Sequence, residues 1–341
     1  MDGLDIYSVP ALGDHHPLSV YGLDSLSPAP PSSWKRPPIL LLHGRTWSSL
    51  PVYHLLGGDL SKDPSKNPLI KSTDEIHESR SLMESLYDLG LQPYTMDFRG
   101  FGGTPCDSTG YVEPHRCVRD TVTVLSWIAN RHGIEVDTSV ESSSVSLTPL
   151  PKKNSNMPAL FGWSQGALVA QLAAQQHPSM MSKLVLYGSI YDPMVRYPRE
   201  ALYKVNEPNQ EKRPNTYNDA IEDFTIENTI PQEPARMFAE AALVTDPIKA
   251  VWKHLYQFNN CDPARVNVPT LVIGGDQDPY APLHVQQELF LNLGRGSDRT
   301  WSILSDADHA GHVLDDAKDR FANIVTSFVI NGKRDEWLRT P

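Results

Sequence analysis

Ala159-Leu160-Phe161-Gly162-Trp163-Ser164-Gln165-Gly166 is the stretch that decides the fold of this chain. Its apolar start is typical of a buried strand, and the run that follows, ALVAQLAAQQHP at 167–178, is typical of a helix. A G-x-S-x-G motif at such a junction places its serine on a strained turn, with the helix amino terminus beside the hydroxyl. The motif alone is also compatible with an ordinary turn. The strand and helix around it favour Ser164 as a nucleophile.

Short apolar runs typical of strands recur on both sides of this stretch, at 39–42, 91–97, 159–163, 183–189, 269–275 and 299–304. Residues 118–129 and 314–328 carry apolar side chains at helical spacing. This alternation predicts an α/β fold with a mostly parallel, doubly wound sheet and right-handed crossovers. Residues 7–23 are expected to add an antiparallel hairpin at one edge, which brings the sheet to eight strands.

Two long stretches interrupt the alternation. Residues 134–157 are rich in serine and lack periodicity, so we expect a surface excursion. The loop 57–74 is expected to decorate the surface as well, with a place at the rim of the site as the alternative. Residues 192–262 lie between two core strands and contain helical patterns at 235–244 and 247–258. We therefore expect an α/β core formed by 1–191 and 263–341, and a helical cap formed by 192–262. Met and aromatic residues at helical spacing are more often core than substrate wall. Those of the cap, with Tyr191 just before it, are Tyr191, Met194, Tyr197, Tyr203, Met237, Phe238 and Trp252.

Composition restricts the partners and the compartment. The formal net charge of -11 disfavours binding to nucleic acid or to an anionic membrane surface. No segment approaches the roughly 18 apolar residues of a spanning helix, and the first residues lack a signal-peptide pattern, so we expect a cytoplasmic protein without a membrane span. Cys106, Cys117 and Cys261 are odd in number and contain no C-x-x-C, which indicates neither a disulfide framework nor a zinc site.

Partners for a nucleophilic serine follow the last two strands. A serine needs a base, and a histidine held by a buried carboxylate serves best near neutral pH. Asp276 and Asp278 are the candidate acids after the strand at 269–275, and His309 and His312 are the candidate histidines after the strand at 299–304. H-x-x-H could also hold a metal, but no third ligand stands at helical spacing, so we expect no metal and no cofactor.

Four blocks carry a resemblance to a known superfamily. LLLHGRTWS at 40–48, DFRGFGGT at 97–104, GWSQG at 162–166, and GGDQDPYAP at 274–282 with SDADHAGH at 305–312 resemble, in order, motifs of the α/β-hydrolase superfamily. The resemblance covers nearly all of the chain outside 134–157 and 192–262. One departure is Thr104, where serine is common.

The resemblance implies a role for each candidate. It selects Asp278, with Pro282 four residues on, as the acid and His309 as the base, in the chain order nucleophile, acid, histidine. The backbone N–H groups of Arg45 and Gln165 are implied as the oxyanion hole. The Arg45 side chain is expected to point to solvent or to the cap, with pairing to a substrate carboxylate as the alternative.

The implied reaction is hydrolysis of a small-molecule carboxylic ester or related acyl bond through an acyl-enzyme. An acyltransferase or an aminopeptidase could use the same triad, because the triad does not decide which acceptor takes the acyl group. A receptor that binds ligands without catalysis is the alternative from another class. We expect the segment 192–262 to determine substrate choice, since it is inserted between core strands.

Overall fold

The structure is a computed structural model, and it describes residues 3–26, 36–55, 80–135, 156–191, 212–221, 224, 232–296, 298–313 and 315–330. The predicted loop 57–74, most of the serine-rich stretch, and three aromatic and Met candidates of the cap lie outside the described residues. These three are Met194, Tyr197 and Tyr203.

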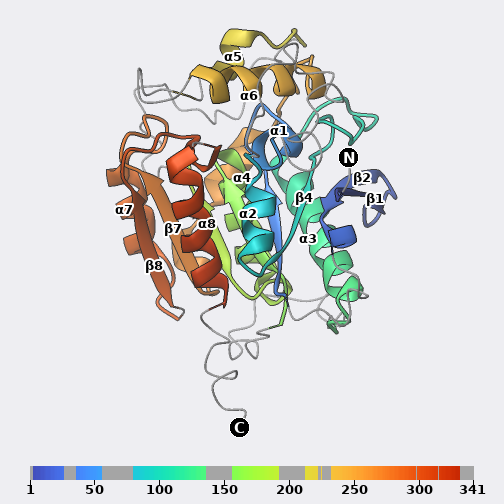
Figure 1. The fold of residues 1–341 in the computed structure, drawn as a ribbon. Coiled ribbons are helices and arrows are strands. Elements are labelled where there is room, and N and C mark those ends of the chain that lie inside the picture. The colour runs from blue at the N-terminus through green and yellow to red at the C-terminus, as the bar shows by residue number, and fades with distance from the viewer. Residues whose placement is uncertain are drawn as a thin grey trace.

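An eight-stranded sheet forms the centre of the fold (Figure 1). Its strands are β1 (Asp5–Pro10), β2 (Pro17–Gly22), β3 (Pro38–Leu42), β4 (Gln92–Met96), β5 (Ala159–Trp163), β6 (Leu184–Tyr187), β7 (Thr270–Gly275) and β8 (Arg299–Leu304). Their order is β1-β2-β4-β3-β5-β6-β7-β8. β1 and β2 form an antiparallel hairpin, β2 joins β4 antiparallel, and all other neighbours are parallel. The predicted fold class is confirmed, including the edge hairpin.

Helices connect the parallel strands. They are α1 (Ser49–Tyr53), α2 (Leu82–Asp88), α3 (Pro114–Arg131), α4 (Gln165–Gln176), α5 (Tyr217–Ile221), α6 (Gln232–Thr245), α7 (Leu283–Asn292) and α8 (Asp315–Ile330). α3 begins at Pro114, a first helical position where the missing N–H of proline costs nothing. Its apolar residues recur every three to four positions and form one stripe that packs on the sheet.

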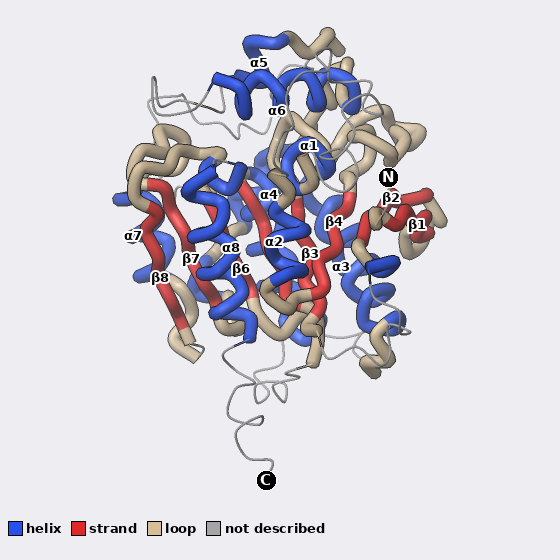
Figure 2. The backbone as a smooth tube through the Cα atoms, in the orientation of Figure 1, coloured by secondary structure: helices blue, strands red, loops and turns tan. Residues whose placement is uncertain are grey.

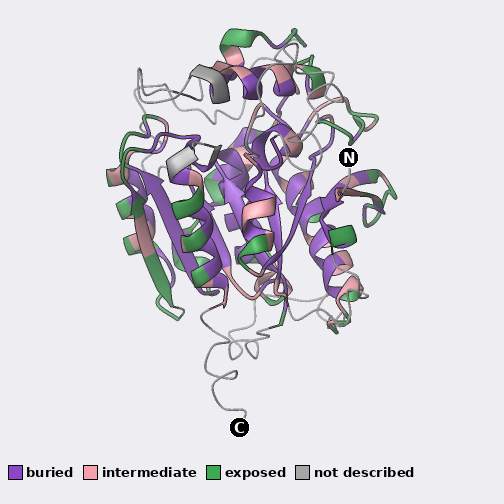
Figure 3. Cartoon of the chain, in the orientation of Figure 1, coloured by how far each residue is buried: buried purple, intermediate pink, exposed green. Residues whose placement is uncertain are grey.

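Alternate residues of each central strand point to opposite faces of the sheet. In β3, Ile39 and Leu41 join a cluster with α1, α2, α6 and α8, while Leu40 and Leu42 join a second cluster with α3, α4 and α7. Because both faces are covered, β3 to β7 are buried along their whole length, whereas the edge strand β8 is partly exposed (Figure 3). This explains why β3, β5 and β6 are continuous apolar runs.

α5 and α6 lie together beyond the ends of the strands, on the side of the sheet where α1 lies (Figure 2). α6 contacts α1 there, and Phe238 of α6 packs edge-on against Trp47 with ring centroids 6.3 Å apart. The pattern at 235–244 correctly predicted α6.

The helix expected over 247–258 is wrong. Residues 247–254 are extended or irregular, and a 3₁₀ helix covers only Leu255–Asn260. The backbone amides of this stretch bond to distant segments instead of to the preceding turn: Lys249 N–H donates to Arg213 O, and Lys253 N–H donates to Val112 O, both at 2.9 Å. Tertiary partners therefore override the helical pattern.

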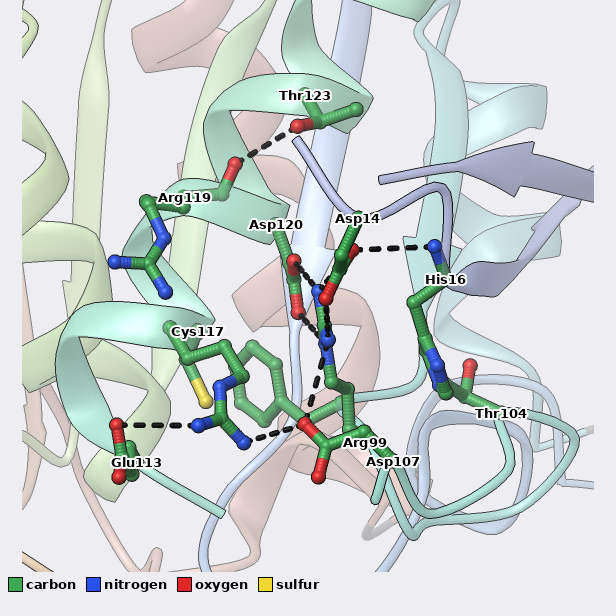
Figure 4. A network of polar contacts seen from close by, with 12 residues as sticks. Asp14, His16, Arg99, Thr104, Asp107, Glu113, Cys117, Arg119, Asp120 and Thr123 are labelled. Atoms are coloured by element: carbon green, nitrogen blue, oxygen red, sulfur yellow. Dashed lines mark hydrogen bonds and ion pairs between the residues drawn. The ribbon is translucent and has the colours of Figure 1, made fainter. Parts of the chain in front are cut away.

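Arg99 fastens the 97–104 loop to its surroundings (Figure 4). Its guanidinium makes two hydrogen bonds to Asp120 of α3, at 2.7 and 2.8 Å, and also pairs with Asp14 in the β1–β2 turn and with Asp107. Thr104 bonds the same loop from within, since its hydroxyl donates to Asp97 O at 2.9 Å and accepts from Ser19 N–H at 2.8 Å. The departure from serine at position 104 thus keeps a bonded hydroxyl.

Candidate active site

Ser164 occupies the sharp turn between β5 and α4. Its backbone has φ 56° and ψ −125°, a strained conformation for a residue with a side chain. Glycine is required on both sides: a Cβ on Gly162 would lie 2.4 Å from Gly166 O, and a Cβ on Gly166 would lie 2.3 Å from His43 O. The sequence G-x-S-x-G therefore forms the elbow that the motif predicts.

The loop after β3 lies directly against this elbow. A Cβ on Gly44 would be 3.2 Å from Ser164 Cβ and 3.3 Å from the Trp163 ring. Arg45, whose backbone amide is a predicted oxyanion donor, follows Gly44 and is half-buried. Gln165, the other predicted donor, is the first residue of α4 and is fully buried. The structure thus brings the loop of the first predicted donor to the elbow that carries the second.

His309 and Asp278 form a buried pair beyond the ends of β8 and β7. His309 Nδ1 lies 2.8 Å from Asp278 Oδ2, and both side chains are at most 3 % exposed. The other Asp278 oxygen accepts the N–H groups of Tyr280 and Ala281, each at 2.9 Å. Asp276 is exposed instead and accepts Ala307 N–H in a turn, at 3.4 Å. Of the two candidate acids, Asp278 is the one beside the histidine.

Trp163 connects this pair to the elbow. Its Nε1–H donates to His309 O at 2.7 Å, and its ring centroid is 5.4 Å from that of His309. Gly188, with φ +50°, follows β6 beneath the pair, and a Cβ there would lie 3.1 Å from the His309 ring and 3.2 Å from Asp278 Oδ2. The sequence interpretation missed both residues. A glycine inside the predicted strand at 183–189 was the available signal for Gly188, because a glycine there often marks a close approach of the backbone to another group.

His312 lies in an aromatic box beside this site. Its ring centroid is 4.9 Å from that of Trp163, 5.5 Å from Tyr187 and 5.7 Å from Tyr53. Burial lowers the pKa of His312 to about 3, so the ring is neutral at ordinary pH. Within the ranges that the structure describes, no three His, Cys, Asp or Glu side chains gather to hold a metal ion.

His43 supports the loop that carries Arg45. Its Nε2 accepts Phe98 N–H at 3.0 Å, so the proton of the neutral ring is on Nδ1, which donates to Gly44 O at 3.0 Å. That carbonyl and the Arg45 N–H belong to one planar peptide unit, and they point in opposite directions. His43 thereby orients the Arg45 amide, and burial, which lowers the pKa of His43 to about 4, keeps the ring neutral.

Two buried carboxylates hold the same loop from the other side. Asp97 Oδ1 accepts Ser49 N–H at 2.9 Å, and Asp246, just after α6, accepts Ser48 N–H at 2.8 Å. Trp252 Nε1–H donates to Arg45 O at 2.9 Å. No sequence signal predicted these bonds of Asp246 and Trp252, because their partners are about 200 positions away along the chain.

The comparisons with known proteins agree with this geometry at the level of the fold. A model of the Alpha/beta hydrolase family matches residues 39–324. No curated protein matches the chain.

Solved structures similar to this chain include several hydrolases. One is a serine hydrolase involved in carbazole degradation, the CarC enzyme, with 16% identity, a TM-score of 0.56, and coverage of 96% of this chain and 98% of that chain. Another is a thermophilic esterase from Thermogutta terrifontis, with 15% identity, a TM-score of 0.55 and coverage of 98% of both chains. A monoacylglycerol lipase from Paleococcus ferrophilus has 16% identity, a TM-score of 0.51, and coverage of 87% of this chain and 96% of that chain.

Proposed function

The chain belongs to the alpha/beta hydrolase family, and on that premise we propose that it is a serine hydrolase that cleaves a carboxylic ester or related acyl bond. Ser164 is the nucleophile, His309 the general base and Asp278 the acid that holds the histidine. The observation that carries the proposal is the buried hydrogen bond of 2.8 Å between His309 Nδ1 and Asp278 Oδ2. A carboxylate at Nδ1 leaves Nε2 as the nitrogen that accepts a proton from serine.

The proposed reaction begins when His309 Nε2 takes the Ser164 hydroxyl proton as the oxygen attacks the substrate carbonyl. Collapse of the tetrahedral intermediate breaks the bond to the leaving group, which receives that proton from His309. Water then attacks the acyl-enzyme, again with His309 as base, and releases the acid and free Ser164. The Asp278 carboxylate stabilises the His309 imidazolium during both acylation and deacylation. Two backbone N–H groups bind its second oxygen and hold the carboxylate in place.

We assign the developing negative charge on the carbonyl oxygen to the N–H groups of Arg45 and Gln165. Gln165 N–H is at the amino terminus of a 12-residue helix, where the backbone dipoles favour negative charge. Arg45 N–H is oriented through His43 and Gly44. Donors fixed in advance stabilise the transition state without reorganisation at the moment of reaction.

The division into domains is part of the proposal. Residues 1–191 and 263–341 form the catalytic core and 192–262 form the cap, which is supported by the position of α5 and α6 beyond the carboxyl ends of the strands (Figure 1). The end of this segment nevertheless packs into the core: Trp252, Leu255, Phe258 and Cys261 join the cluster that contains α3 and α4. Among the described residues of the cap, helices α5 and α6 are therefore the part best placed to contact a small-molecule substrate.

Hydrolysis of a series of p-nitrophenyl esters, from acetate to long chains, tests the proposal. We expect turnover by the wild type that disappears in Ser164→Ala and persists in Ser182→Ala, a matched control at a serine outside the site. The preferred chain length then measures the acyl pocket. Equal turnover in Ser164→Ala, or none in a folded wild type with any ester, would overturn it.

A further inference from the structure

Asp246 is a buried carboxylate contributed by the inserted segment, outside the proposed triad. It is 4 % exposed and follows α6 directly. Its Oδ2 accepts Ser48 N–H at 2.8 Å, and its Oδ1 accepts Gly102 N–H at 2.9 Å. Asn215 Nδ2 holds the main chain of the same residue by donating to Asp246 O at 2.8 Å. One side chain thus connects the cap to two loops of the core.

Asp97 binds the neighbouring amides of the same two loops. Its Oδ1 accepts Ser49 N–H and its Oδ2 accepts Gly103 N–H, both at 2.9 Å. Consecutive amides in each loop therefore go to different carboxylates. Gly102, with φ +46°, permits this arrangement, because a Cβ there would lie 2.3 Å from Asp97 Oδ2.

Two neighbouring buried carboxylates are electrostatically unfavourable. Burial raises the pKa of both Asp97 and Asp246, and the charge of Asp97 adds to the rise at Asp246. Simple packing of α6 would need only an apolar contact, such as the one that Phe238 makes with Trp47. Asp246 does more than pack α6. Its two oxygens hold the backbone N–H groups of Ser48 and Gly102 and so fix the path of both loops.

The inserted segment holds the loop at a second point. Trp252 Nε1–H donates to Arg45 O at 2.9 Å, so Arg45 and Ser48 are both attached to residues of this segment. The stretch 45–48 between these attachments begins at the residue whose amide we assign to the oxyanion hole. A shift of the loop end at Ser48 would therefore move that amide relative to Ser164.

We propose that Asp246 is a positioning residue for the oxyanion hole: its carboxylate fixes the 43–48 loop and makes the placement of the Arg45 amide depend on the seating of α6. This inference rests on the proposed function and deepens it. The cap then contributes to the rate of the chemical step in addition to enclosing the substrate. α6 cannot move away from the core without withdrawing the acceptor from Ser48 and Gly102.

Asp246→Asn tests this directly, because an amide keeps the size of the side chain but offers one acceptor and turns an N–H₂ group toward the other backbone N–H. We expect kcat for a p-nitrophenyl ester to fall about 10- to 100-fold, as for a misplaced oxyanion donor, with KM nearly unchanged. Binding of a trifluoromethyl ketone, whose serine adduct carries an oxyanion, should weaken by a similar factor. Asp262→Asn, a matched change at an exposed carboxylate that accepts Ala264 N–H at the far end of the same segment, should alter neither quantity.

Hydrogen exchange on the Ser164→Ala background separates this inference from the proposed function, because it needs no turnover. Asp246→Asn should speed amide exchange by about tenfold or more in peptides covering 43–50 and 98–104, and Asp262→Asn should not. If Asp246→Asn speeds exchange in these peptides but the wild type has no esterase activity, the proposed function is refuted and the attachment of the loop by Asp246 stands. Unchanged exchange in these peptides, or a rise in KM without a fall in kcat, would overturn the positioning role.

Discussion

At the scale of single residues, the contact between His309 and Asp278 predicts how a change at Asp278 affects turnover. Asp278→Asn should lower kcat by about 10³- to 10⁴-fold with little change in KM, because an amide no longer holds the tautomer in which Nε2 accepts the serine proton. Steady-state kinetics on an ester substrate measure this. The matched control is Asp276→Asn, which removes an exposed turn carboxylate and should stay within about twofold of wild type. A larger effect at position 276 than at 278 would reassign the acid.

The buried His312 should make the stability of the protein depend on pH. Its pKa of about 3 in the folded protein lies below the value of 6.5 for an unperturbed histidine, so between these values the unfolded state binds more protons. The free energy of unfolding should therefore fall with decreasing pH by up to about 1.4 kcal/mol per unit from this residue alone. His312→Phe, which suits the aromatic box, removes that contribution. Urea unfolding of both proteins from pH 7 to 4.5 should show the wild type losing stability relative to the variant; a constant difference would contradict the assignment.

The sequence pointed to the residues of the proposed site to different extents. Ser164, Asp278 and His309 stand in motifs whose spacing is local, and the structure brings Asp278 and His309 together as the resemblance implies. Position after the strand left Asp276 and Asp278 both open, and the resemblance selected Asp278, which is the buried one of the two. Asp246 could not be identified as a site residue, because its contacts depend on how distant loops pack.

At the scale of elements, Arg99 joins the β1–β2 turn, the 97–104 loop and α3. Arg99→Ala should lower the free energy of unfolding by about 3–5 kcal/mol, because it leaves the buried Asp120 carboxylate without its partner. Chemical denaturation measures the loss. The double variant Arg99→Met with Asp120→Leu should recover much of it, since no buried charge remains. A double variant as unstable as Arg99→Ala would show that the ion pair itself, and not the orphaned carboxylate, dominates.

The inserted segment should determine substrate choice. Replacing 192–245 with the corresponding segment of another member of the family, while keeping Asp246 and the core-packed residues that follow, should change the preferred ester chain length and preserve turnover. Keeping 246–262 matters because Trp252 and Phe258 belong to the core cluster. Selectivity profiles over the p-nitrophenyl series give the readout. An unchanged profile would place the selectivity in the core.

Elements were predictable where a single periodicity dominated. The six apolar runs all became parallel strands, and the pattern at 235–244 became α6. The pattern at 247–258 failed, because Val251 and Lys253 take part in backbone hydrogen bonds with Val112 across the molecule. A helical arrangement of apolar residues does not reveal such bonds.

At the scale of the whole molecule, the alternation of strands and helices predicted a doubly wound sheet, and the two hydrophobic clusters on its opposite faces agree. The strand order β1-β2-β4-β3-β5-β6-β7-β8 was not predictable in detail, because apolar runs buried on both faces do not specify their neighbours. Among the described residues, no helix has the length and apolarity to cross a membrane. The net charge of -11 remains the argument against nucleic-acid partners.

The central claim is that Ser164 is an activated nucleophile, and the most direct test is to locate the adduct formed with a fluorophosphonate probe. After labelling, trypsin should release residues 154–183 carrying the phosphonate, and fragmentation in the mass spectrometer should place it on Ser164. We predict stoichiometric labelling of the wild type, none in Ser164→Ala, and labelling slowed by about 10³-fold or more in His309→Ala. An adduct on another residue, or labelling at the wild-type rate in His309→Ala, would contradict the account.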